Sequence, residues 1–241
     1  MTQVQENREF LRARFADVRT RIESRARACN RSPEEITLIA ISKTQPVNVL
    51  KQALESGITE FGENRVQEAE SKIIEVGRRK ARWHLVGHLQ ANKARRALSL
   101  FDVIHSLDSI DLAHRLDRLC AEEGREELPV LIQVDLGHED TKSGVSEAGL
   151  LELVKSLDEC AKLRLRGLMT LPPFFDDPEQ TRPFFRRLRE LRDQLESQGR
   201  FPNGKGELSM GMTHDFEVAV EEGATMLRVG TAIFGERSFK T

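Results

Sequence analysis

The 241-residue sequence has no tyrosine, one tryptophan and only three cysteines. Cys29, Cys120 and Cys160 are odd in number, far apart and outside any C-x-x-C pair, which favours reduced thiols in a cytosolic protein. No apolar run approaches the roughly 20 residues that a membrane-spanning helix needs, and the N-terminus lacks the apolar core of a signal peptide. We therefore expect a cytoplasmic protein without a membrane partner.

The chain also lacks an excess of charge of either sign, because 37 Lys and Arg residues nearly cancel 39 Asp and Glu residues. A balanced charge gives no general attraction for nucleic acid. One arginine-rich stretch is interleaved with apolar residues at 184, 185 and 188, and we interpret it as a solvated helix face: Arg182, Arg186, Arg187, Arg189 and Arg192. We expect no nucleic-acid partner.

What the chain does contain is a regular alternation of short apolar runs and amphipathic stretches. Two of the helical patterns are closed by glycine, at 47–56 before Gly57 and at 183–198 before Gly199. Eight runs read as strands: ITLIAIS, ITEFGE, RWHLVGH, FDVIHS, PVLIQVDL, LRLRGLM, GELSMG and TMLRVG. Eight strands alternating with helices in about 250 residues predict a (β/α)₈ TIM barrel, with residues 1–241 as a single domain. The alternative, a doubly wound open sheet, is disfavoured because it would carry a nucleotide-binding loop after its first strand, and neither G-x-G-x-x-G nor G-x-x-x-x-G-K occurs there.

The N-terminal segment lies outside this alternation. Residues 6–29 place Leu11, Phe15, Val18 and Ile22 at spacings of four and three on an otherwise arginine-rich stretch. We expect residues 1–30 to form an extra amphipathic helix that packs on the barrel.

The residues that follow the apolar runs are unusually polar, and in a barrel the chemistry lies at the carboxyl ends of the strands. The first run ends in Ser42-Lys43-Thr44, so a lysine follows a strand that reads as buried on both faces. A solvated lysine at a strand end is the plain alternative. Burial would favour the neutral amine, which is nucleophilic.

The last two runs predict a phosphate-binding site. Small residues expose backbone N–H groups there, Ser209 and Thr231 add hydroxyls, and Thr213 could begin a helix. A lysine opposite a phosphate site suggests an imine with a phosphorylated aldehyde. Arg228 would lie close by, and because a guanidinium only donates, it would keep a neighbouring pyridine nitrogen unprotonated.

Other polar residues at the strand ends keep two interpretations. Asn64 either contacts the cofactor or caps a helix that starts at Arg65, and His88 either touches the cofactor ring or is a hydrogen-bonded histidine of the barrel mouth. His84 and His88 are four residues apart, but the intervening LVG reads as strand, so we expect no metal site. Four methionines favour packing over chemistry: Met169, Met210, Met212 and Met226.

Seven ordered motifs carry a family resemblance: AISKTQP, FGENRVQE, WHLVGHLQANK, IHSLDS, GLMTLP, LSMGMTHD and LRVGTAIFGER. From about Ile36 to Arg237 the chain closely resembles the pyridoxal phosphate homeostasis proteins of the YggS/PROSC type. The resemblance implies a barrel like the N-terminal domain of alanine racemase, with pyridoxal 5'-phosphate held as an imine on Lys43. The implied cofactor-binding residues are Lys43, Asn64, Met169, Ser209, Gly211, Met212, Arg228, Gly230 and Thr231.

The sequence leaves two functions open. One is a carrier that stores and delivers pyridoxal phosphate without turnover, and the other is a racemase-like enzyme. Alanine racemase-like enzymes use a tyrosine from an added domain as second base, and this chain has no tyrosine and ends eleven residues after Gly230. We therefore expect no catalytic residue and a carrier, with cofactor-dependent apoenzymes as possible partners. We also expect a monomer.

Overall fold

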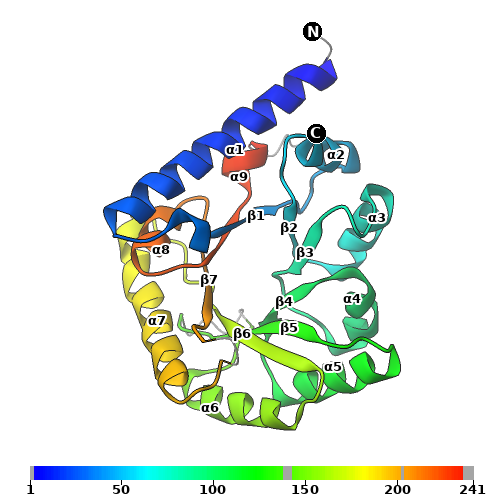
Figure 1. Ribbon diagram of the computed structural model, residues 1–241, viewed down its shortest axis with the longest axis vertical. Coiled ribbons are helices and arrows are strands. Elements are labelled where there is room, and N and C mark those ends of the chain that lie inside the picture. The colour runs from blue at the N-terminus through cyan, green and yellow to red at the C-terminus, as the bar shows by residue number, and fades with distance from the viewer. Residues whose placement is uncertain (1–2, 138–142, 202–203, 236–241) are drawn as a thin grey trace.

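Eight parallel strands close into a barrel in sequence order in a computed structural model, which describes residues 3–137, 143–201 and 204–235 (Figure 1). The first and last strands pair with each other, with Ile39 opposite Arg228. The strands are β1 Thr37–Ile41, β2 Glu60–Glu63, β3 Arg82–Leu85, β4 Val103–Leu107, β5 Leu128–Gln133, β6 Leu163–Met169, β7 Glu207–Met212 and β8 Met226–Val229. The eight predicted runs thus correspond to the eight strands, and the predicted TIM barrel is confirmed.

Helices follow the strands and ring the barrel on its outside (Figure 1). They are α1 Gln3–Ala28, α2 Val47–Glu55, α3 Val66–Val76, α4 Ala94–Leu100, α5 Ile110–Glu122, α6 Glu147–Ser156, α7 Arg182–Ser197, α8 Phe216–Glu221 and α9 Thr231–Phe234. Short 3₁₀ turns lie at η1 Pro33–Glu35, η2 Ala91–Lys93, η3 Leu157–Glu159 and η4 Pro178–Thr181. The glycines after α2 and α7 have φ of +91° at Gly57 and +69° at Gly199, as the sequence predicts for helix ends.

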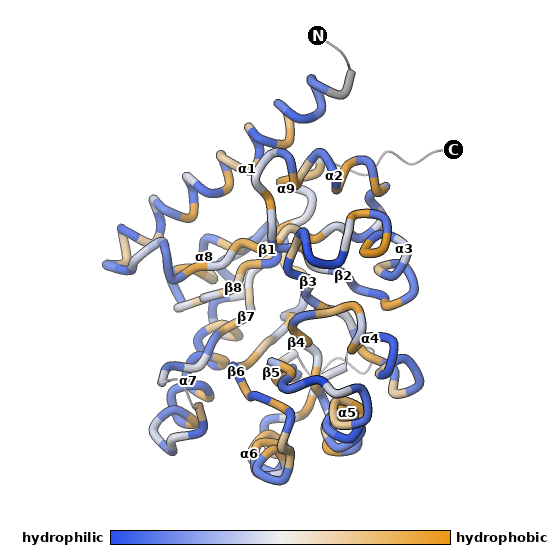
Figure 2. The backbone as a smooth tube through the Cα atoms, turned by 45° about the vertical axis from the view of Figure 1, so that its right-hand side comes forward, coloured by the Kyte–Doolittle hydropathy of each residue, from blue (hydrophilic) through white to orange (hydrophobic). Residues whose placement is uncertain are grey.

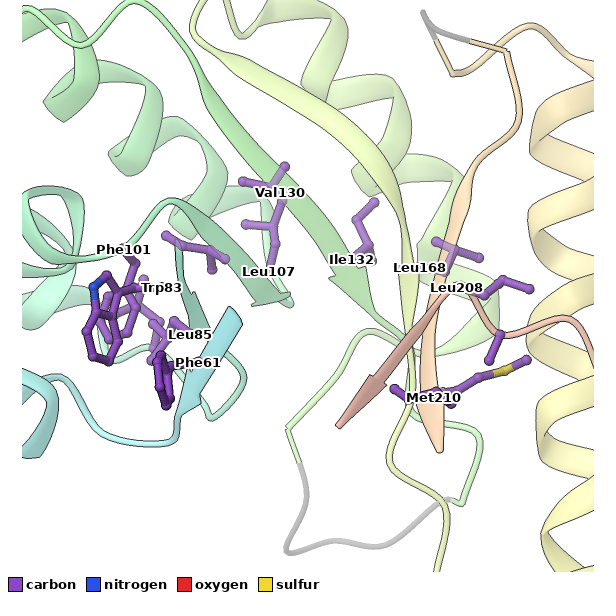
Figure 3. Packing of buried hydrophobic residues seen from close by; sticks show 14 of the residues in the cluster. Phe61, Trp83, Leu85, Phe101, Leu107, Val130, Ile132, Leu168, Leu208 and Met210 are labelled. Atoms are coloured by element: carbon purple, nitrogen blue, oxygen red, sulfur yellow. The ribbon is translucent and has the colours of Figure 1, made fainter. Parts of the chain in front are cut away.

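The main hydrophobic core lies between the strands and the helices. Phe61 on β2 and Trp83 on β3 are fully buried there and stack with ring centroids 5.3 Å apart, next to Phe101 (Figure 3). Around the rest of the barrel the same layer continues through aliphatic residues of the outward faces, including Ile132 and Leu168 (Figure 3). The alternation of the strands explains this layer, since every second residue points outward.

The barrel interior contains a separate and smaller apolar cluster. It is formed by Ile39, Val103, Leu131, Met169 and Met226. Buried polar residues occupy other inward positions of the strands, so this cluster fills only part of the interior. These polar residues position the candidate site.

Helix α1 precedes the barrel and lies across its outer surface beside α8 and α9 (Figure 1). Leu11, Val18 and Ile22 are buried, and Phe15 packs against the core while partly exposed. Hydrophobic and hydrophilic residues alternate along this helix (Figure 2). The apolar stripe predicted for residues 6–29 therefore faces the rest of the molecule. Within the described residues, none of the helices has the length and apolar character needed to cross a membrane.

Candidate functional site

Lys43 lies just beyond β1, at the carboxyl end of the barrel, and is half-buried. The preceding residue, Ser42, is fully buried, and its N–H donates to the carbonyl of Gly62 at 3.0 Å. The following residue, Thr44, has φ of +66°, a left-handed conformation that is uncommon outside glycine. Lys43 is thus held between a residue paired to β2 and a tight turn.

A buried ion cluster braces this turn, formed by Lys72 of α3 with Glu63 and Glu68, and we call it the Lys72 clamp. The Lys72 ammonium donates to Glu63 at 2.8 Å, to Glu68 at 2.7 Å and to the Ser42 carbonyl at 2.7 Å. The Ser42 hydroxyl donates to Glu63 at 2.6 Å, and the Thr44 N–H donates to Glu68. Burial raises the pKa of Glu63, and the charge of Lys72 opposes that rise. The clamp therefore holds the residues on both sides of Lys43.

Arg228 on β8 is the buried cation of the same region, with 3% of its surface exposed. Its guanidinium donates to the Ser209 hydroxyl at 2.7 Å and to the carbonyl of Thr170 at 2.8 Å. Burial lowers the pKa of Arg228 to about 10, against the attraction of Asp215. At neutral pH the group is still protonated and can only donate.

Backbone N–H groups and hydroxyls gather where β7 and β8 end. The N–H groups of Gly230 and Ala232 donate long hydrogen bonds of 3.3 and 3.4 Å to the Thr213 hydroxyl. Gly211 has φ of +89°, and a Cβ there would come within 2.5 Å of the Ala219 side chain. Thr231 is exposed. Convergent amides and hydroxyls suit the oxygens of a phosphate, so the residues present fit the phosphorylated cofactor that the sequence predicts.

The barrel order brings the predicted residues together. Strands β1 and β8 are neighbours, and Gly230 lies against the end of β1, where a Cβ would be 3.4 Å from the Ile41 carbonyl. Lys43, Arg228 and Gly230 therefore share one end of the barrel although they span most of the chain.

Ser209 and Met169 lie deeper than the sequence suggests. The fully buried Ser209 hydroxyl contacts Arg228 and His105, the latter at 2.9 Å, rather than the backbone amides at the end of β8. Met169 is fully buried in the apolar cluster of the interior. The hydroxyl that accepts from the amides of Gly230 and Ala232 is that of Thr213.

Asn64 and His88 line an open cavity of about 740 Å³ beside β2 and β3, together with Lys93. His88 makes a 3.1 Å contact with Asp108, which matches the interpretation of a hydrogen-bonded histidine at the mouth. The interpretation of Asn64 as a helix cap is wrong. Helix α3 begins at Val66, so Arg65 occupies the N-cap position, and its side chain makes no capping hydrogen bond.

His84 and His88 lie in different surroundings. His84 is buried inside the barrel on β3, whereas His88 lies past the strand end and is largely exposed. Among the described residues, no group of three or more His, Cys, Asp or Glu side chains is placed to hold a metal ion.

Several residues of the site were missed by sequence reasoning. The Lys72 clamp joins α3 to a strand end, and the spacing of nine residues between Glu63 and Lys72 gives no motif. Glu60 and His105 were recognisable only as polar residues inside apolar runs, at positions that alternate with core residues, and His84 was considered only as half of a metal pair.

A family model described as "Alanine racemase, N-terminal domain" matches residues 19–238. A pyridoxal phosphate homeostasis protein of Aquifex aeolicus is 40% identical over 226 residues, covering 94% of this chain and 98% of the relative. The protein of the same name from Escherichia coli K12 is 41% identical over 233 residues, covering 93% and 96%.

Solved structures agree with these relatives. The structure of PipY from Synechococcus elongatus with PLP bound is 37% identical and superposes with a TM-score of 0.81, covering 93% of this chain and 100% of that one. The structure of the same protein without PLP is 38% identical in sequence and superposes with a TM-score of 0.83. This chain belongs to the alanine racemase N-terminal domain family and, within it, to the pyridoxal phosphate homeostasis proteins.

Proposed function

We propose that this protein binds pyridoxal 5'-phosphate at the carboxyl end of its barrel and acts in the homeostasis of that cofactor, storing and delivering it without turnover of a substrate. The observation that carries the proposal is the convergence of Lys43, the buried Arg228 and the amide-rich end of β8 at one barrel mouth. The solved PipY structure with PLP bound, at 37% identity, supports it.

Each residue has a proposed role. Lys43 holds the aldehyde carbon of the cofactor as an imine, and Arg228 faces the ring nitrogen. Gly211, Met212, Gly230 and Thr231 hold the phosphate, with Thr213 added to them because its hydroxyl accepts from the amides of Gly230 and Ala232. Ser209 acts through Arg228, which donates to it. Asn64 and Met169 contact the cofactor from the neighbouring strand ends.

The proposed absence of turnover rests on the acid and base groups of the site. When bound, the cofactor supplies a ring that draws electrons from an attached amine, most strongly when its nitrogen is protonated. A donor-only guanidinium keeps that nitrogen unprotonated, so the ring is a weak electron sink. Racemisation also needs a base on each face of the substrate carbon, and the chain has no tyrosine to serve as the second base.

We also propose that residues 1–241 act as one cofactor-binding domain, monomeric and cytoplasmic. The three cysteines support a reducing compartment, since Cys29, Cys120 and Cys160 are free thiols in the structure. Cofactor-dependent apoenzymes are the proposed recipients.

The experiment starts from purified holoprotein, whose cofactor is fixed by borohydride and located by peptide mapping. The adduct is expected on Lys43, and Lys43→Ala should not be labelled there; labelling of another lysine in the wild type would contradict the site. Lys51→Ala, a change at an exposed lysine of α2, is the matched control and should be labelled like the wild type.

The carrier role is tested separately with the same holoprotein. Incubation with each amino acid in deuterated water should give no rapid exchange at the α-carbon, and cofactor should appear in an added apoenzyme faster than free release allows. Rapid exchange followed by inversion of configuration would instead support the racemase-like alternative.

A further inference from the structure

A continuous row of hydrogen bonds crosses the interior of the barrel, and we call it the interior relay. Glu60 of β2 contacts His84 of β3 at 2.6 Å, and His84 contacts His105 of β4 at 2.8 Å. His105 then contacts Ser209 of β7 at 2.9 Å, and Arg228 of β8 donates to Ser209 at 2.7 Å. Since β4 and β7 are not neighbours in the barrel, the contact between His105 and Ser209 spans its interior.

With both histidines neutral, the Glu60 end gives each bond of the relay a direction. Arg228 can only donate, so the Ser209 hydroxyl accepts from it, and in this direction the hydroxyl gives its own proton to the Nδ1 atom of His105. The Nε2–H of His105 then donates to the Nδ1 atom of His84. The Nε2–H of His84 donates to Glu60, which as a carboxylate only accepts. Each histidine therefore carries its proton on Nε2.

Burial supports this assignment. His84, His105 and Ser209 are fully buried, whereas the side chain of Glu60 is 26% exposed. Burial, reinforced by His84, Arg228 and Arg82, lowers the pKa of His105 well below its ordinary value, so the ring is neutral with one donor and one acceptor. The relay thus has the donor-only Arg228 at one end and the carboxyl group of Glu60 at the other, with Ser209 and two imidazole rings between them.

We propose that Glu60, His84 and His105 are positioning residues that hold Ser209 and Arg228 for the ring of the bound cofactor. The relay makes the Ser209 hydroxyl a fixed acceptor for the guanidinium. A carboxylate at the amino-terminal edge of the barrel thereby sets the orientation of a cation close to the opposite mouth. The proposal rests on the proposed function through the role of Arg228 at the ring nitrogen.

The direction of the relay is tested without cofactor. Long-range ¹H–¹⁵N spectra of the full-length apoprotein should show both His84 and His105 as neutral Nε2–H tautomers at neutral pH. In Glu60→Ala the His84 signals should shift toward a mixture of tautomers, while Glu75→Ala, a change at an exposed glutamate of α3, should leave them unchanged. A proton on Nδ1 of either wild-type histidine would overturn the relay.

The positioning role is tested with pyridoxal 5'-phosphate and its 1-deaza analogue, in which the ring nitrogen is a C–H group. Wild type and Glu75→Ala should prefer the natural ligand by about tenfold or more, because the analogue cannot accept from Arg228. Glu60→Ala should reduce that preference by about threefold or more, and Glu60→Gln, whose amide oxygen can still accept, should restore most of it.

The outcomes separate the two proposals. If wild type binds neither ligand, the proposed function and the positioning role both fail, while the spectra still decide the direction of the relay. If wild type binds with the expected preference and Glu60→Ala keeps that preference, the positioning role alone is overturned.

Discussion

At the residue scale, the barrel mouth depends on charged groups that are buried with their partners. Lys72 and Glu63 keep only 6% and 0% of their side chains exposed, so the Glu63 carboxylate depends on Lys72 as its charged partner. The same pair bonds the backbone and the hydroxyl of Ser42, next to Lys43. Structural stability and the placement of the candidate lysine therefore depend on the same contacts.

Replacing Lys72 by methionine should destabilise the protein by about 3–5 kcal/mol, because it leaves the buried Glu63 carboxylate without its cation. The free energy of unfolding from urea titrations measures this. Lys51→Met removes an exposed lysine from α2 and should change stability by less than about 0.5 kcal/mol. Equal effects of the two changes would contradict the role given to the Lys72 clamp.

A second residue-scale prediction concerns pH. Asp215 is buried and accepts the N–H of Met212 at 2.6 Å, and burial raises its pKa above the ordinary 3.8. The folded protein therefore holds this proton more tightly than the unfolded chain does. As pH rises from 3.8 through the raised pKa, the folded state loses stability relative to the unfolded state.

Asp215→Asn removes the charge and keeps an oxygen that can accept from Met212. The stability of this variant relative to wild type should increase with pH from 3.8 upward and become constant above the raised pKa. Unfolding titrations at a series of pH values measure the difference. Asp17→Asn, at an exposed aspartate of α1, is the control for loss of a surface carboxylate, and a flat profile for Asp215→Asn would refute the assignment.

At the element scale, the N-terminal helix supports the last short helix of the barrel. Arg14 of α1 donates from Nε to the carbonyl of Ala232 at 2.7 Å and from its guanidinium to the carbonyl of Thr231 at 3.2 Å. Helix α9 has only four residues, so most of its carbonyl groups have no partner within the helix. Helix α1, which lies outside the barrel, thus holds residues 231 and 232 at the candidate phosphate site.

Arg14→Met should destabilise the protein by about 1–2 kcal/mol, since both hydrogen bonds involve a charged donor but are partly exposed. Amide hydrogen exchange should accelerate at Gly230 and Ala232, whose N–H groups bond Thr213. Arg12→Met, an exposed arginine two residues earlier on α1, should leave exchange at those amides unchanged. If both variants exchange at the wild-type rate, α1 does not support α9.

At the scale of the whole molecule, the described surface has few large apolar side chains. Those that are exposed lie on three different helices and one loop: Phe10 on α1, Ile74 on α3, Leu151 on α6 and Phe174 after β6. Scattered residues of this kind do not form the contiguous patch that a stable dimer buries. The monomer stays a prediction.

Sedimentation velocity should therefore give a single species near 27.4 kDa over a wide range of protein concentration. Phe174→Ser, which removes the most exposed of these side chains, should sediment like the wild type. A mass that doubles with concentration would show that the expectation of a monomer is wrong.

The sequence by itself determined the architecture, because the relevant signals are local. Strand runs, helical stripes and the glycines at 57 and 199 depend on neighbours a few residues away, and eight such units leave few topologies. Lys43 was also predictable, since a lysine directly after a buried strand is itself a local anomaly.

Only the tertiary structure decided how the interior polar groups pair. His105 and Ser209 are 104 residues apart, and Arg14 and Ala232 are 218 apart, so closure of the barrel and docking of α1 create these contacts. Ser209 is an example. Its position at the end of a strand is local and suggested a phosphate contact, but the direction of its hydroxyl depends on Arg228 and His105 across the interior. A hydrogen bond between distant strands leaves no periodic trace in a single sequence, because its two partners share neither a helix turn nor a strand face.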